Sequence, residues 1–320
     1  MVSKQEKGES FAPQVLETVN LPESFGPKIQ GKVRDNWVLP DGRRVMVTTD
    51  RQSAFDRMVC LTPGKGRQLN MLSAFWFGQT ADIVPNHMLA VPHPNVMICK
   101  ECQPIPLEVV VRDYITGSTE TSLWVNYRQG KNPYKLLLPP GLVKNQKLPE
   151  IYFTPTTKAL DHDDPTPRLE AASRFGEIYW EMEKVSAALF ERASSIYSES
   201  GLILVDTKFE FGGDKDGKLT LIDELFTPDS SRIWLAETYD KKFSHKEEPD
   251  SLDKEFLRLW LKDQGFSGDG SVPLVPAKIT NRLAALYTEP YKRLTGQDLS
   301  DVDSSPRAVR AAILNYFGKT

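Results

Sequence analysis

The stretch LVDTKFEFG, residues 204–212, is predicted to be a strand whose two faces differ in chemistry. Side chains alternate across a strand, so one face of this run, extended by one residue, carries apolar groups and a threonine: Ile203, Val205, Thr207, Phe209 and Phe211. The other face follows Leu204 with three charged groups: Asp206, Lys208 and Glu210. The apolar face suits a core, whereas the charged face is either solvated or serves a ligand.

The segment that follows helps to choose between these two interpretations. Asp216-Gly217 is a favoured two-residue turn pair, and as the turn centre it places Glu210 opposite Asp223. A register shifted by two residues places Lys208 opposite Asp223, whereas a shift of one residue would bury Asp223 on the apolar face. Facing carboxylates repel each other, and a divalent cation between them removes the conflict. Two carboxylates suit Mg²⁺, beside which Lys208 could neutralise a phosphate or carboxylate.

The composition argues against several classes of protein. The chain has 320 residues, 40% of them hydrophobic and 26% charged, with a net charge of −3, which suits one large domain or two smaller ones. No apolar run is long enough to span a membrane, and the first ten residues do not resemble a secretory signal. Three cysteines favour a reducing, cytoplasmic compartment, and Cys99 and Cys102 have no further zinc ligands nearby. The acidic balance disfavours nucleic acid as a partner.

A second anion-binding candidate is VVVRDYITGS, residues 109–118. Arg112 leaves a predicted buried strand just before a turn of Thr116, Gly117 and Ser118. Backbone N–H groups in such a turn, together with two hydroxyls and a guanidinium, could bind a phosphate. A plain turn at the end of a strand, with a surface arginine, explains this stretch equally well.

Two further basic stretches are weaker candidates. In GKVRD, residues 31–35, Gly31 lets the backbone approach a ligand, while Lys32 and Arg34 supply positive charge. PGKGR, residues 63–67, leads into a predicted helix whose N-terminus attracts anions, although a solvated loop is the simpler interpretation. Several anion-binding sites beside one metal site are typical of an enzyme whose substrates are small molecules with phosphate and carboxylate groups.

Hydrophobic periodicity and turn signals predict the order of the elements. They are a hairpin at 28–49 around Asp41-Gly42, a helix at 66–79, a strand at 105–115, a loop at 131–168 with seven prolines, a helix at 167–200 ended by Gly201, strands at 202–211 and 218–226, and helices at 252–263 and 276–294. Strands come first and mixed strands and helices follow, which predicts an α+β fold.

These segments together resemble the SAICAR synthetase family. The matching stretches run in family order over residues 28–240, and IPLEVVVRDYITGS (105–118) and LVDTKFEFG are the two most diagnostic of them. The others are GKVRD (31–35), TTDRQSAFD (48–56), PGKG (63–66), LSAFWF (72–77), PNHM (85–88), FTPTTKA (153–159) and IDELFTPDSSRIW (222–234). The tail with PYKRLTG (290–296) resembles the family's longer form.

The resemblance implies both a fold and an activity. The fold would have a β-rich N-terminal lobe, residues 1–110, related to the protein-kinase small lobe, and a larger α+β lobe, residues 111–320, with the ATP cleft between them. The activity would be an ATP-dependent ligation that joins L-aspartate to carboxyaminoimidazole ribonucleotide (CAIR), giving SAICAR, ADP and phosphate. The alternative is a phosphotransferase that uses the same ATP site on another small molecule. A monomer or homodimer is expected.

The resemblance also implies a role for each matching residue. Lys208 would contact the reacting phosphate, Asp206 would hydrogen-bond CAIR, and Glu210 and Asp223 would hold Mg²⁺. The residues implied to bind the nucleotide are Gly31, Lys32, Val33, Arg34 and Lys65. The residues implied to bind CAIR or to line its cleft are Asp50, Ser53, Arg112, Thr116, Gly117, Ser118 and Arg232.

Overall fold

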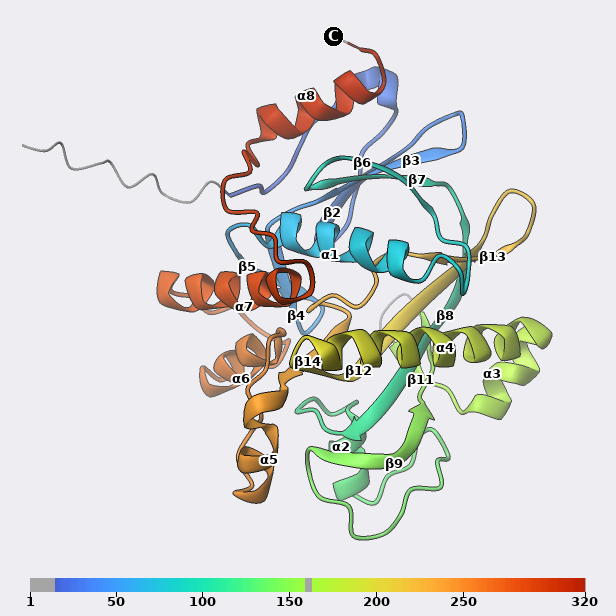
Figure 1. Ribbon diagram of the computed structural model, residues 1–320, viewed down its shortest axis with the longest axis vertical. Helices are drawn as coiled ribbons and strands as arrows, with labels where there is room; N and C mark the ends of the chain where they lie inside the picture. The colour runs from blue at the N-terminus through green and yellow to red at the C-terminus, as the bar shows by residue number, and fades with distance from the viewer. Residues whose placement is uncertain (1–14, 159–162, 320) are drawn as a thin grey trace, which may run out of the picture.

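A five-stranded antiparallel sheet forms the N-terminal part of the protein, at the top of Figure 1. The computed structural model describes residues 15–158 and 163–319. The strands of this sheet, in spatial order, are β1 (Ile29–Gln30), β2 (Arg34–Val38), β3 (Arg43–Thr48), β7 (Val96–Lys100) and β6 (Met88–His93). The predicted hairpin is confirmed: β2 pairs with β3, and Gly42 has φ 79° in the turn between them.

A second, seven-stranded sheet is built around two long strands, β8 (Gln103–Ile115) and β12 (Leu202–Gly213), which pair antiparallel. The other strands of this sheet are β9 (Gln146–Phe153), β10 (Thr156–Lys158), β11 (Asp163–Pro165), β13 (Leu219–Ile222) and β14 (Ser231–Leu235). A separate small hairpin pairs β4 (Arg51–Ala54) with β5 (Arg57–Leu61). Antiparallel sheets combined with separate helices confirm the α+β class.

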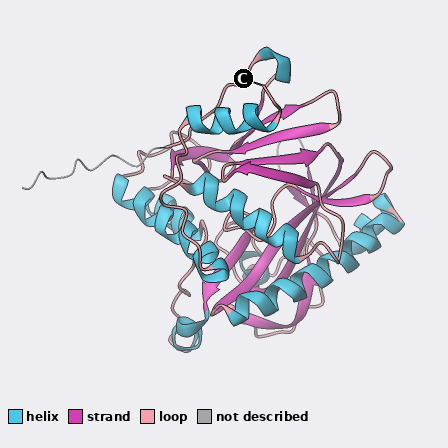
Figure 2. Cartoon of the chain, turned by 45° about the horizontal axis from the view of Figure 1, so that its top comes forward, coloured by secondary structure: helices cyan, strands magenta, loops and turns pink. Residues whose placement is uncertain are grey.

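Helices pack against the sheets, as Figure 2 shows, and α1 lies between the N-terminal sheet and α4. They are α1 (Lys65–Gln79), α2 (Leu123–Arg128), α3 (Arg168–Phe175), α4 (Glu177–Glu199), α5 (Ala236–Ser244), α6 (Glu255–Asp263), α7 (Ala277–Thr295) and α8 (Pro306–Tyr316), with a short 3₁₀ turn at Glu23–Phe25. The predicted helices at 66–79, 252–263 and 276–294 are confirmed as α1, α6 and α7. No helix in the described part of the chain is long and apolar enough to cross a membrane.

The main core lies where α1 and α4 meet strand β12. Trp76 of α1 packs against Tyr197 of α4, with ring centroids 4.9 Å apart, and against Phe226, with centroids 5.0 Å apart. Phe209 and Phe211 of β12 belong to the same cluster, as the strand periodicity predicted. This packing fixes β12 from its apolar side and leaves the opposite side for charged groups.

The alternation of side chains along β12 is interrupted at its N-terminal end. A β-bulge lies between Leu204 and Asp206, because their partners on β14 are consecutive residues. Leu204 therefore joins the main core with Phe209, whereas Val205 joins a separate cluster that contains Trp234. The predicted faces were right from Asp206 onward and wrong before it, since a bulge adds one residue to the strand.

Two predictions between residues 131 and 200 were wrong. The predicted single helix at 167–200 is broken at Gly176, whose left-handed φ of 64° separates α3 from α4. Leu169 of α3 is 76% exposed and does not belong to the core. The predicted loop at 131–168 contains strands β9, β10 and β11. Proline is compatible with edge strands, where a missing N–H donor costs no ladder hydrogen bond.

The C-terminal helix α8 returns to the N-terminal sheet (Figure 1). Val309 and Ile313 of α8 are buried in one cluster with Trp37, Val45 and Ile98 of that sheet. The sequence pattern did not predict α8, and the predicted boundary at residue 110 falls within β8. The division into 1–110 and 111–320 stays a prediction, and we propose that the change of lobe comes at the start of β8.

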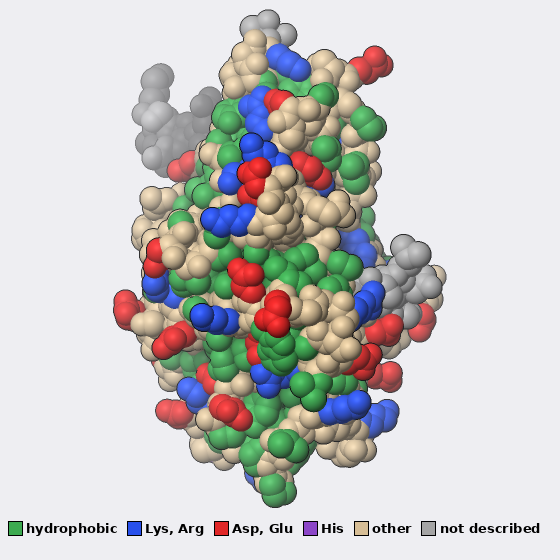
Figure 3. Space-filling view, turned by 90° about the vertical axis from the view of Figure 1, so that its right-hand side faces the viewer, with side chains coloured by type: hydrophobic (Ala, Val, Ile, Leu, Met, Phe, Trp, Pro, Cys, Tyr) green, Lys and Arg blue, Asp and Glu red, His purple; other side chains and the backbone are tan. Residues whose placement is uncertain are grey.

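The surface view in Figure 3 shows acidic and basic side chains interspersed on this face of the molecule.

All three cysteines carry free thiols, and Cys99 and Cys102 are buried at the end of β7 and just before β8. Burial raises the pKa of the Cys99 thiol, which keeps it protonated and inert.

Candidate functional site

Three neighbouring strands place Arg112, Asp206 and Arg232 in one row. Asp206 on β12 lies directly opposite Arg112 on β8 and Arg232 on β14. The Oδ2 atom of Asp206 accepts hydrogen bonds from Nη1 of Arg112 at 2.7 Å and from Nη1 of Arg232 at 2.5 Å. Asp206 is only 4% exposed, and Arg112 also donates to Thr154 through Nε at 2.8 Å. The carboxylate therefore holds two guanidinium groups side by side.

Lys208 lies two residues further along β12, among three carboxylates. Its ammonium is 2.9 Å from Oε1 of Glu108, hydrogen-bonds Glu210, and lies 3.9 Å from Oδ2 of Asp223. Burial opposes the positive charge, but the carboxylates outweigh it, led by Glu210, and hold the pKa of Lys208 well above its usual value. The three charges of β12 thus line one continuous surface with charges from neighbouring strands.

Glu108 belongs to this cluster, although sequence reasoning did not select it. It faces Glu210 across the β8–β12 ladder. A signal was present, because Glu108 and Arg112 are four residues apart on a strand and therefore share a face. What the sequence could not supply was the pairing of that face with β12.

The predicted register of the β12–β13 hairpin was wrong by one residue. Glu210 pairs with Ile222 rather than Asp223, because the N–H of Gly217 bonds the carbonyl of Asp214 and adds a residue to the turn. Strand alternation alone would then direct Asp223 away from the charges. The strand ends at Ile222, however, and Asp223 takes a left-handed φ of 69°. This turn of the backbone brings its carboxylate to Lys208 one step diagonally from Glu210.

The PNHM segment, residues 85–88, holds β13 just before that turn. The N–H of Leu221 donates to the carbonyl of Pro85 at 2.9 Å, and the N–H of His87 donates to the carbonyl of Leu221 at 3.1 Å. His87 is 3% exposed, and burial is the main cause that lowers its pKa to about 4. The backbone of this segment thus supports the chain next to Asp223, and the imidazole of His87 packs against Phe77.

The segment that contains Gly31 contacts the carboxylates of Asp223 and Glu224 through the side chain of Arg34. The guanidinium of Arg34 hydrogen-bonds Asp223, and its Nη2 is 3.2 Å from Oε2 of Glu224. These carboxylates raise the pKa of Arg34 despite its burial. The N–H of Gly31 donates to the carbonyl of Arg34 at 2.8 Å and closes a tight turn. Lys32, on that turn, forms a 2.7 Å ion pair with Asp56, which lies in the turn between β4 and β5.

Three other predicted site residues have structural partners that position the nearby loops. The carbonyl of Val33 accepts from the N–H of Thr49 at 3.0 Å. Asp50 is fully buried and accepts from the backbone N–H groups of Gly64 at 3.2 Å and Gly66 at 2.8 Å, which fixes the PGKG loop. Ser53 is half-buried on β4. Direct ligand contacts by these residues stay predictions.

The turn after β8 is closely packed against Arg232. Gly117 has φ 106°, and a Cβ on it would lie 2.4 Å from Cβ of Ser122 and 3.1 Å from Nη2 of Arg232. Thr116 donates to Asn145 at 2.6 Å. A cavity of about 250 Å³ opens beside Thr116, Gly117 and Arg232. Within the described residues, Nε of Arg232 is a buried donor without a partner. This guanidinium can therefore donate a further hydrogen bond to an anion bound in the turn.

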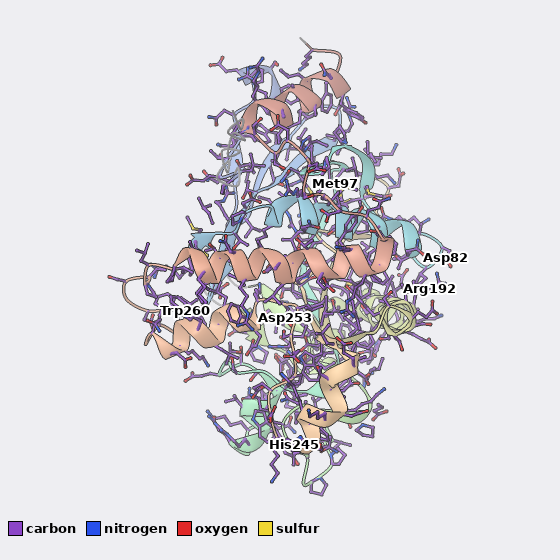
Figure 4. All side chains as sticks on the ribbon, turned by 60° about the vertical axis from the view of Figure 1, so that its left-hand side comes forward. Asp82, Met97, Arg192, His245, Asp253 and Trp260 are labelled. Atoms are coloured by element: carbon purple, nitrogen blue, oxygen red, sulfur yellow. The ribbon has the colours of Figure 1, made fainter. Side chains whose placement is uncertain are left out.

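Asp253, labelled in Figure 4, links the strand that carries Arg232 to the start of α6. Its Oδ2 accepts from the N–H of Ile233 at 3.1 Å, and its Oδ1 accepts from the N–H of Glu255 at 2.7 Å. Glu255 lies 3.9 Å from Arg232, and the opposing charges of Arg232 and Arg258 outweigh burial and lower its pKa to about 2. The guanidinium of Arg232 is therefore positioned by Glu255 as well as by Asp206.

The donor chemistry of Glu210 and Asp223 fits Mg²⁺. Mg²⁺ takes one or two carboxylates and completes its shell with water and phosphate oxygens. Within residues 15–158 and 163–319, no group of three or more histidine, cysteine or acidic side chains is arranged to hold a metal. A protein site here would therefore depend on phosphate oxygens for its remaining ligands.

Comparisons with known proteins agree with this geometry. The family model described as SAICAR synthetase matches residues 28–273. The phosphoribosylaminoimidazole-succinocarboxamide synthase of Legionella pneumophila (strain Lens) is 45% identical over 308 residues, which cover 95% of this chain and 97% of that protein.

Solved structures give the same result. The SAICAR synthase from Saccharomyces cerevisiae, complexed with SAICAR, superposes with a TM-score of 0.76 at 34% identity, covering 89% of this chain and 99% of that one. A SAICAR synthetase in complex with ADP superposes with a TM-score of 0.65 at 26% identity, covering 85% of this chain and 99% of that one. The predicted resemblance is confirmed, and this chain belongs to the SAICAR synthetase family.

Proposed function

We propose that this protein joins L-aspartate to the carboxylate of CAIR in an ATP-dependent reaction of purine biosynthesis, giving SAICAR, ADP and phosphate. Family membership supports the reaction, and the relatives solved with SAICAR and with ADP support the ligands. The observation that carries the proposal is the arrangement on one sheet face: Lys208 lies among carboxylates, next to the row of Arg112, Asp206 and Arg232.

CAIR would bind along this face, with its phosphate in the turn beside Gly117. Arg112 and Arg232 supply two guanidinium groups for an anion, and both are hydrogen-bonded to the same oxygen of Asp206. The spare Nε donor of Arg232 and the closely packed turn favour a phosphate at that end. The carboxylate of CAIR would then lie toward Lys208.

ATP would bind under the segment of residues 31–34, with its phosphates toward Lys208 and Arg34. A carboxylate oxygen of CAIR attacks the γ-phosphorus, the bond to the bridging oxygen breaks, and ADP leaves. Lys208 neutralises charge on the transferred group. Glu210 and Asp223 would hold Mg²⁺, which would offset the negative charge that develops during transfer.

The aspartate amine completes the reaction. Its nitrogen attacks the acyl carbon, the carbon–oxygen bond to phosphate breaks, and the proton that the amine loses passes to the released phosphate or to solvent. The enzyme contributes position and charge neutralisation in both steps and forms no covalent intermediate. The face that carries Lys208 and the row of Arg112, Asp206 and Arg232 suits this two-step reaction, because it supplies charged groups that position and neutralise the substrates.

The test is an assay of ADP release in which each substrate is omitted in turn. Full turnover is expected only with ATP, CAIR and L-aspartate together, with slow partial turnover when aspartate is absent. ADP release at the full rate without aspartate would instead identify a phosphotransferase.

Three other expectations belong with this proposal. A cytoplasmic location is expected, and the free thiols of the three cysteines support it. Assembly as a monomer or homodimer is to be measured by light scattering. The relation of the N-terminal lobe to the protein-kinase small lobe stays a prediction.

A further inference from the structure

A buried polar network connects helix α7 to the loop before β14. The hydroxyl of Tyr287 donates to Oδ1 of Asp229 at 2.5 Å and accepts from Nε2 of Gln52 at 3.1 Å. The other oxygen of Asp229 forms a 2.8 Å ion pair with Lys65, which also donates to the carbonyl of Arg51 at 3.0 Å. Tyr287, Gln52 and Lys65 have no exposed surface. Asp229 therefore has one partner on α1 and another on α7.

The loop that carries Asp229 continues to the charged cluster. The N–H of Lys208 donates to the carbonyl of Ser230 at 3.0 Å, directly after Asp229. Thr227 donates to Glu224 at 2.7 Å, and Glu224 pairs with Arg34 at 3.2 Å. The hydroxyl of Thr227 also accepts from the N–H of Asp229 at 3.2 Å. A shift of Asp229 would therefore be transmitted to both Lys208 and Arg34.

Helix α7 lies outside the part of the chain that the family model matches. That match ends at residue 273, and α7 spans Ala277–Thr295. Tyr287 nevertheless packs in one buried cluster with Ala54 of β4, Leu69 of α1 and Leu257 of α6. A residue beyond the family's matched region thus completes the hydrogen bonding beneath the site.

The hydroxyl of Tyr287 has a specific task in this network. Without it, the Oδ1 atom of Asp229 would lose its tyrosine donor, and the amide nitrogen of Gln52 would keep only the carbonyl of Ser53, at 3.3 Å, as an acceptor. Buried polar groups left without partners are unfavourable, so the loop would move to find new ones. The ring could stay in its apolar cluster, because phenylalanine has the same ring.

We propose that Tyr287 is a positioning residue, which acts through Asp229 to hold Lys208 and Arg34 at the nucleotide end of the site. This inference rests on the proposed function, which assigns that end to ATP. At the CAIR end, Arg112 has a separate hydrogen bond to Thr154, and the turn at Gly117 packs closely beside Ser122. Nucleotide binding should therefore depend on the Tyr287 hydroxyl more than CAIR binding does.

The test compares Tyr287→Phe with Tyr291→Phe on the same helix. Tyr291 is 3% exposed, and its hydroxyl donates to Gln297 at 2.9 Å, away from the network. Binding of MgADP is measured by calorimetry, and KM is measured for ATP and for CAIR. Tyr287→Phe should weaken MgADP binding and raise the KM for ATP about tenfold, the usual effect of losing a supporting contact, with the KM for CAIR within about twofold. Equal behaviour of the two variants, or equal changes for ATP and CAIR, would overturn the proposal.

A second variant tests whether Tyr287 acts through Asp229. Asp229→Asn should show the same selective loss for MgADP, and the double variant should be no weaker than the poorer single variant. Losses that multiply to about 100-fold would overturn the route through Asp229. If Tyr287→Phe does not fold, Asp229→Asn alone must show the selective loss for MgADP, and an unselective loss overturns the proposal. Wild-type protein that binds MgADP but makes no SAICAR would count against the proposed function, while the binding comparison would still decide the role of Tyr287.

Discussion

Replacement of Asp206 by asparagine tests the central row of charges. The change keeps the shape of the side chain and removes the negative charge between Arg112 and Arg232, whose side chains are 10% and 15% exposed. Removing one partner of a buried ion pair costs about 3–5 kcal/mol, because a buried charge is left uncompensated. We expect the lower end, about 3 kcal/mol, since Arg112 keeps Thr154 and Arg232 keeps Glu255.

The assay is thermal unfolding in increasing concentrations of inorganic phosphate. For a chain of 320 residues, a loss of about 3 kcal/mol corresponds to a fall in Tm of about 4–5 °C. Phosphate should restore more of the Tm of Asp206→Asn than it adds to wild type, because two unpaired guanidinium groups bind an anion more strongly than paired ones.

The matched control is Glu183→Gln on α4. Glu183 is also buried and pairs with an arginine, accepting from Nε of Arg168 at 2.7 Å and from Tyr179 at 2.8 Å. The Tm of Glu183→Gln should also fall, but phosphate should raise it by the same amount as it raises the Tm of wild type. A Tm for Asp206→Asn within about 2 °C of wild type, or the same phosphate response in both variants, would refute the reasoning.

The remaining predictions concern the metal, the turn and acid stability. Glu210→Gln and Asp223→Asn should lower turnover at least about 100-fold and raise the Mg²⁺ needed, measured as ADP release against Mg²⁺; normal turnover at low Mg²⁺ would remove the assignment. Gly117→Ala should raise the KM for CAIR about tenfold, because the new Cβ meets Ser122; an unchanged KM would place the phosphate elsewhere. Burial lowers the pKa of His87 from 6.5 to about 4, so the unfolded state binds the proton first and stability falls as pH drops through this window. The Tm of His87→Gln should therefore fall less than that of wild type over this range, and parallel curves would contradict the assignment.

Local patterns in the sequence predicted most of the elements near the site. Alternation identified the charged face of β12 from Asp206 onward, and helical periodicity identified α1 and α7. These patterns depend on neighbouring residues in one element, so they can be found without knowing the fold. The break at Gly176 was missed because the apolar spacing continues across it while the backbone does not.

The sequence by itself determined that Asp206, Lys208 and Glu210 share a face, because covalent geometry alternates side chains along a strand. Tertiary structure alone decided their partners. It added Glu108 through the pairing of β8 with β12, and it brought in Asp223 through a left-handed turn rather than through the predicted register. It also placed Tyr287 beside Asp229, 58 residues away in the chain. The physical reason is that register, bulges and buried ion pairs follow from the packing of distant segments, which no local pattern specifies.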